Sequence, residues 1–163
     1  MPRFNLENAL EALELQQLVT EWCRELDENH GLDAIRFFTE DCVVEAGLIS
    51  YRGHEAMQAF YCGIAAFAQP TPERGIRTTR HTYTSLGISF GGRERATVTF
   101  LSFTYSGYGD TPLSGATAPN TISDVRFECR RDVQGEWRVA EFYATPIFLG
   151  EDPYLNQLIK EDQ

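Results

Sequence analysis

The chain carries little positive charge and has no long apolar run. Its 14 basic residues are outnumbered by 24 acidic ones, which gives a formal net charge of −10. A surface of this sign repels phosphate backbones and anionic lipid headgroups. No apolar stretch approaches the roughly 20 residues of a membrane-spanning helix, and the first residues lack the basic-then-apolar order of a signal peptide. We therefore expect a soluble, cytoplasmic protein that binds neither nucleic acid nor membranes.

Patterns for metal ions, disulfides and nucleotides are also missing. The cysteines form no C-x-x-C pair, and we expect free, mostly buried thiols; they are Cys23, Cys42, Cys62 and Cys129. The three histidines lack the H-x-x-x-H spacing of a metal site. No phosphate-binding glycine loop occurs. Residues 87–91 spell G-x-S-x-G, but they lie at the end of an expected strand before a Gly-Gly turn and lack the strand-to-helix turn of a nucleophile elbow. What is left is acid–base chemistry without a cofactor or metal, or simple binding.

Length and composition predict one domain, residues 1–163. The chain is 42% hydrophobic and 23% charged, which is ordinary for a globular protein that builds a single core. Helical periodicity predicts a long helix over about residues 6–29 and a shorter one around residues 32–38, which ends at a polar turn. A short strand over 42–48 follows, and a third helix runs from about Met57 to the proline-rich stretch at Pro70.

The second half of the chain reads as sheet. β-branched and aromatic residues become dense, and short glycine-containing turns separate the runs. The expected strands are Thr78–Phe90, Glu94–Ser106, Thr121–Arg131 and Glu136–Ile147, with a long loop over 107–120. Helices followed by antiparallel strands indicate an α+β domain with its helices on one face of a curved sheet. Such a cone tends to enclose an apolar pocket for a small molecule.

Asp27 and His81 are the first candidates for chemistry. Asp27 lies in the last turn of the first expected helix, where the helix dipole disfavours an unpartnered carboxylate by roughly 0.3–1 kcal/mol. Either a partner favours it, or it belongs to a solvated acidic helix end. His81 begins the first long strand and is either a structural residue or a general base that a carboxylate orients. Together they would make a proton-abstraction dyad.

Further polar groups are expected near the pocket. A tyrosine hydroxyl there can hold a substrate oxygen, although most tyrosines in sheets are simply packed. The candidates are Tyr51, Tyr83, Tyr105 and Asp124. For Asp124, an edge charge and a pocket wall are both open interpretations, because it interrupts an otherwise apolar strand.

Four segments in this order resemble the SnoaL-like branch of the NTF2-like superfamily. They are ELDENHGLDAIRFFTEDCVV, YRGHEAM, TTRH and DVQGEWRVA. The resemblance spans about residues 12–145, which implies a domain core of about 12–147 and a C-terminal extension over 148–163. It implies a cone-shaped α+β fold, in which three helices pack on a strongly bent antiparallel sheet around a pocket.

The resemblance also bears on the site. In dehydratase and dehydrochlorinase relatives an aspartate ending the first helix pairs with a histidine starting the first long strand, and Asp27 and His81 occupy those two positions. The chain departs from scytalone dehydratases, which carry a second histidine on the next strand. It departs from bile-acid dehydratases as well, because Trp22 stands near the place of a tyrosine and would contact the substrate instead.

Two functions follow as expectations. The first is a cofactor-independent lyase or isomerase, dehydratase- or cyclase-like, that acts on a hydrophobic, oxygenated small molecule. His81 would remove a proton, Asp27 would orient the imidazole, and Tyr51 or Tyr83 would stabilise the developing oxyanion. The second is a non-catalytic binding domain, or a structural subunit resembling the small subunit of a ring-hydroxylating dioxygenase. We also expect a homo-oligomer, a dimer or a trimer.

Overall fold

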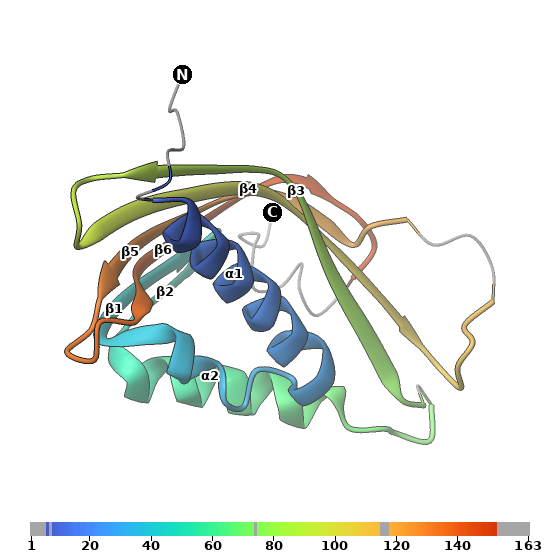
Figure 1. Ribbon diagram of the computed structural model, residues 1–163. Helices are drawn as coiled ribbons and strands as arrows, with labels where there is room; N and C mark the ends of the chain where they lie inside the picture. The colour runs from blue at the N-terminus through green and yellow to red at the C-terminus, as the bar shows by residue number, and fades with distance from the viewer. Residues whose placement is uncertain (1–5, 7, 74, 115–117, 153–163) are drawn as a thin grey trace.

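The computed structural model describes residues 6, 8–73, 75–114 and 118–152 (Figure 1). Its helices are α1 (Ala9–Asn29) and α2 (Gly53–Ala68), with a short 3₁₀ helix over Ala34–Phe37 between them. Its strands are β1 (Phe38–Ala46), β2 (Ile49–Arg52), β3 (Arg77–Phe90), β4 (Arg95–Tyr108), β5 (Thr121–Arg131) and β6 (Trp137–Leu149). The predicted α+β class is confirmed.

One six-stranded sheet carries both helices on the same side. The strand order is β2-β1-β6-β5-β4-β3. The pair β1–β6 is parallel and the remaining pairs are antiparallel. The long strands bend around α1 and α2, as Figure 1 shows. The result is a cone-shaped arrangement with both helices on the concave side of the sheet, which is consistent with an NTF2-like fold.

Helix α1 forms where the sequence analysis places it, because its apolar residues recur along one face. The buried positions include Leu15, Leu18, Val19 and Trp22. The helix ends at His30, whose backbone is left-handed with φ 54°. The next residue, Gly31, is also left-handed, and a Cβ there would lie 2.3 Å from the ring of Tyr61. Glycine is therefore required at this turn, which sets the direction of the chain after α1.

The second expected helix is only a single 3₁₀ turn. Phe37 and Phe38 are both buried, and Phe38 already belongs to β1. The expected polar turn at 39–41 is therefore part of β1, and the strand starts four residues before the predicted position. Since a strand can bury Phe38 and Cys42 against the helices at once, tertiary packing outweighs the local helical pattern here.

The predicted hairpins are present. Gly91 and Gly92 lie between β3 and β4, and the Asp132 side chain accepts backbone N–H bonds from Gln134 and Glu136 in the turn before β6. Strand β3 contains an irregularity between Thr84 and Gly87, with a left-handed residue inside it. This bulge reverses which positions of β3 face inward.

The concave face of the sheet changes character along its strands. At one end it is apolar, and the buried residues there include Val98, Phe100, Val125, Phe127 and Val139. Toward the other end of the same strands, hydroxyl side chains take these inward positions, among them Ser102, Thr121 and Ser123. The core therefore fills one end of the cone, and the polar lining marks the other.

Three expectations remain predictions. The single-domain assignment is untested, and most of the expected C-terminal extension, from residue 153 on, lies outside the described residues. The homo-oligomer and the cytoplasmic location are likewise untested. Within the described part of the chain, no helix is long and apolar enough to cross a membrane.

Candidate active site

Asp27 and His81 are in direct contact. Oδ1 of Asp27 lies 2.7 Å from Nδ1 of His81, and the two Asp27 carboxylate oxygens lie 2.9 and 3.0 Å from the His81 backbone nitrogen. Both side chains are largely buried, at 11% and 15% exposed. The carboxylate near the end of α1 therefore has its partners on β3, which answers why an acidic residue stands at the negative end of a helix dipole.

This geometry sets the tautomer of His81. An ionised carboxylate only accepts hydrogen bonds, so Nδ1 carries the proton that it donates to Asp27. The other ring nitrogen, Nε2, then holds a lone pair. His81 lines a cavity between the helices and the sheet, and Nε2 makes no hydrogen bond to a described residue. A histidine held in this way can act chemically as a general base.

Trp22 packs beside the dyad. Its ring centroid lies 6.4 Å from that of His81, and it makes edge contacts with Phe127 at 5.3 Å and Phe142 at 5.6 Å. These contacts fix the indole between the core and the cavity, which it lines. Trp22 therefore belongs both to the core and to the cavity wall, and its contact with a substrate stays a prediction.

Cys23 lies one helical turn before Asp27 but is not a competing nucleophile. Burial raises the pKa of its thiol to about 12, and the negative charge of Asp27 adds to the effect. At pH 8 roughly one thiol in ten thousand would be ionised at such a site. Covalent chemistry at Cys23 is thereby disfavoured.

A thiol-titration experiment tests this burial. We expect one cysteine, Cys62, to react quickly with Ellman's reagent in the native protein, because the other three are buried. All four should react in denaturant. A Cys62→Ser variant should lose the fast phase entirely. Two or more fast equivalents in the native protein would contradict the assignment.

The cavity has a volume of about 200 Å³. An apolar cavity of roughly 150 Å³ already holds benzene, so a compound of one or two rings is the right size here. One wall is apolar and comes mainly from α2, with Met57, Phe60, Ile64 and Phe67. The opposite wall is the hydroxyl-bearing part of the sheet. The cavity therefore matches a molecule with one apolar and one oxygenated side.

The hydroxyl wall is ordered by strand register. His81 on β3 stands opposite Thr104 on β4, which stands opposite Thr121 on β5. Ser102 and Ser123 form a neighbouring pair. Adjacent strands lie about 4.8 Å apart, so hydroxyls follow the dyad at regular intervals across the sheet. The hydroxyl of Thr121 is buried and has no hydrogen-bond partner among the described residues.

Arg77 lines the same cavity but its charge is already compensated. Its guanidinium lies 2.7 Å from a carboxylate oxygen of Asp152, and the two side chains are 7% and 2% exposed. It also donates to the hydroxyl of Tyr108 at 2.8 Å. Asp152 accepts a second bond from Ser106. Arg77 therefore closes one part of the wall and is not a free anion-binding group.

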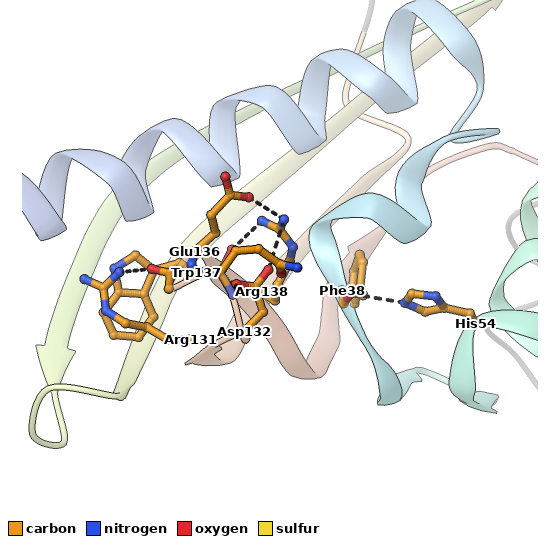
Figure 2. Close-up of polar contacts among 9 residues, drawn as sticks. Phe38, His54, Arg131, Asp132, Glu136, Trp137 and Arg138 are labelled. Carbon is orange, nitrogen blue, oxygen red and sulfur yellow. Dashed lines mark hydrogen bonds and ion pairs between the residues drawn. The ribbon is translucent and has the colours of Figure 1, made fainter.

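The histidine of α2, His54, and the ion pairs of the last hairpin lie outside the site. His54, at the start of α2, has its ring nitrogen 3.1 Å from the carbonyl oxygen of Phe38 (Figure 2) and does not line the cavity. Figure 2 also shows the ion pairs of Arg138 with Asp132 and Glu136. These contacts hold the last hairpin, and His54 ties α2 to β1. Both are structural features.

Only some of the sequence candidates reach the cavity. Tyr51 and Trp22 line it. Tyr83 does not, because its hydroxyl is 2.7 Å from that of Thr20 on α1, which covers this part of β3. Tyr105 lies on the other side of β4 from Thr104 and lines a separate surface groove. Asp124 is exposed on an inner strand, in a shallow hollow of the outer face.

Both interpretations of Asp124 are therefore corrected, since β5 is not an edge strand and the side chain is not at the cavity. Conversely, His30 and the hydroxyl wall line the cavity but were not among the predicted site residues. The sequence does contain a pattern that indicates the hydroxyl wall. Alternate positions of β4 read Ala96, Val98, Phe100, Ser102, Thr104, a switch from apolar to hydroxyl residues on one strand face. No three His, Cys, Asp or Glu side chains cluster as metal ligands among the described residues.

A curved sheet, helices on its concave side and a buried carboxylate–imidazole pair at a small cavity define a class of cone-shaped α+β protein with an internal small-molecule site. The model of the SnoaL-like domain family matches residues 7–143. The chain belongs to this family, and the resemblance described above is confirmed. No curated protein matches the sequence.

Solved structures agree on the fold. A proposed scytalone dehydratase from Novosphingobium aromaticivorans has 19% identity and a TM-score of 0.70, over 86% of this chain and 87% of that one. ActVI-ORFA from Streptomyces coelicolor has 16% identity and a TM-score of 0.67, over 83% and 96%. A proposed aromatic ring hydroxylase from Novosphingobium aromaticivorans has 20% identity and a TM-score of 0.67, over 90% and 93%. At these identities the likeness establishes the fold alone.

Proposed function

We propose that the protein is a cofactor-independent lyase or isomerase that removes a proton from a hydrophobic, oxygenated small molecule. The observation that carries the proposal is the Asp27–His81 hydrogen bond of 2.7 Å at the wall of an internal cavity. The carboxylate holds the imidazole with Nε2 available as the base and stabilises the imidazolium that forms. Both side chains are largely buried, so this stabilisation counts for more than it would between exposed groups in solution.

The cavity wall supports the substrate class. A ketone or enone can lie with its ring against α2 and its oxygens toward the hydroxyls of Thr104, Thr121 and Ser123. The buried Thr121 hydroxyl, which lacks a partner among the described residues, would gain one from the ligand. Tyr51 is the tyrosine we assign to an oxyanion, because Tyr83 is engaged by Thr20.

The shared first step of all these reactions is measurable without knowing the substrate. β-Tetralone is a two-ring ketone with an acidic proton beside its carbonyl, and it suits the cavity in size and polarity. We expect the protein to accelerate exchange of that proton for deuterium, followed by NMR. His81→Gln should lower the rate by about 10²–10⁴-fold, the usual contribution of a general base.

His54→Gln is the matched control, because it removes an imidazole that lies outside the cavity, and its exchange rate should equal that of the wild type. A wild-type rate no greater than that of His81→Gln would contradict the proposal. Tight binding of β-tetralone without exchange would instead favour the non-catalytic binding domain. Copurification with a large iron–sulfur protein would favour the dioxygenase-subunit alternative.

A further inference from the structure

The dyad supplies a base but no acid. If the proposed lyase reaction is correct, and this inference rests on it, the loss of water needs a second group. Hydroxide is a poor leaving group, so a proton must reach the departing oxygen as its bond to carbon breaks. In the scytalone dehydratase pattern a second histidine on the strand after His81 is expected, but β4 places Ser102 and Thr104 there. These hydroxyls are far too weakly acidic for the role.

His30 brings a second imidazole to the cavity from a different element. It caps α1, lines the cavity together with His81, and is partly buried. Its ring has no hydrogen bond to any residue that the structure describes, whereas His54 is held by Phe38. The left-handed backbone at His30 is unusual for a residue with a side chain, and histidine is among the types that tolerate it.

The position of His30 follows from the packing of α1 on β3. Thr20 contacts Tyr83 and Asp27 contacts His81, so the helix and the strand run in opposite directions. His30 is one turn beyond Asp27 and continues the cavity-lining stripe of Trp22 and Leu26. It therefore stands next to the dyad, toward the start of β3.

Other acids at the cavity are less suitable. Burial raises the pKa of Tyr61, which makes its hydroxyl a weaker proton donor, and the nearby Trp22 indole opposes this only in part. Arg77 does not give up its proton and is paired with Asp152. Tyr51 comes from β2, at the opposite edge of the sheet from His81. We have assigned it to the oxyanion.

We propose that His30 is the general acid of this site, and that the site takes β-hydroxy carbonyl compounds. His81 Nε2 takes the proton from the carbon between the carbonyl and the hydroxyl-bearing carbon. The C–H electron pair becomes the C=C bond, and the C–O bond breaks with its electrons on oxygen. The proton of the His30 imidazolium bonds to that oxygen, and water leaves. Proton exchange with solvent restores both rings, so the net products are an enone and water.

A pair of ketones separates the acid from the base. The first ketone is 4-hydroxy-4-phenylbutan-2-one, which loses water. The second is its acetate ester, which loses acetate, and acetate leaves without being protonated. Both give benzylideneacetone, which is followed by its ultraviolet absorbance. The variant is His30→Asn, because asparagine also tolerates the left-handed backbone. His54→Gln is the histidine control.

We expect His30→Asn to lower kcat/KM for the hydroxy ketone by about 10²-fold or more, and for the acetate ester by less than about threefold. His54→Gln should change neither. A merely structural role for His30 would lower both rates equally, and an absent role would change neither; each result would overturn the assignment. Failure of the proposed function looks different, because His81→Gln would then retain the wild-type rate on the acetate ester.

Discussion

Replacing Asp27 by asparagine is expected to lower the deuterium exchange of β-tetralone by about 10²–10⁴-fold. The asparagine amide is neutral, so it cannot stabilise the imidazolium that forms when His81 Nε2 takes a proton. Its NH₂ group can also donate to Nδ1, which would place the His81 proton on Nε2 and remove the lone pair from the cavity. Both effects act on the proton-transfer step, so the loss should appear in kcat.

Asp27→Asn should still fold. Its side-chain oxygen can accept the His81 backbone N–H, which Asp27 binds at 2.9 Å. Removing the charge also relieves a carboxylate near the negative end of the α1 dipole, an effect of roughly 0.3–1 kcal/mol. We expect the denaturant midpoint to lie close to that of the wild type. A variant with full exchange activity would show that the carboxylate is only structural, and an unfolded one would show that the contact is needed for folding.

The fold was largely accessible from local patterns. The apolar stripe that ends near Leu26 predicts α1 to within a few residues, and Gly91-Gly92 and Asp132–Gly135 mark both predicted hairpin turns. The parallel pairing of β1 with β6 was not accessible, because these strands are about a hundred residues apart and no local signal links them. The bulge near Ser85 was not predictable either, because the sequence around it has the pattern of a regular strand.

The site was accessible only in part. Asp27 and His81 were candidates for a dyad from their residue chemistry, and the family resemblance supported their pairing, because periodicity contains no information on long-range contacts. Tyr83 shares a strand face with His81, but α1 crosses over that face and Thr20 binds the hydroxyl. Strand alternation predicts which side of the sheet a side chain faces, but it does not predict which element packs on that side. His30 was overlooked because it follows the last residue of the predicted helix, so the stripe was followed only as far as Leu26.

The second large effect is expected at Arg77. Replacing it by methionine keeps the length of the side chain near Phe67 and Tyr108 but removes the guanidinium that lies 2.7 Å from the Asp152 carboxylate, which is 2% exposed. Breaking a buried ion pair by removing one partner typically costs about 3–5 kcal/mol, because the other charge stays buried. We expect a loss of this size in the free energy of unfolding, measured with urea.

The double variant Arg77→Met/Asp152→Leu decides whether charge is the cause. With both charges removed, the desolvation cost is gone, so the double variant should be clearly more stable than Arg77→Met alone. An equal loss of stability in the single and the double variant would mean that the packing of the guanidinium matters more than its ion pair with Asp152. Asp152 lies three residues beyond the end of the last strand, whereas Arg77 begins β3 and lines the cavity. The pair therefore joins two distant parts of the chain at the cavity wall, and weakening it should also weaken β-tetralone binding while leaving the Asp27–His81 contact in place.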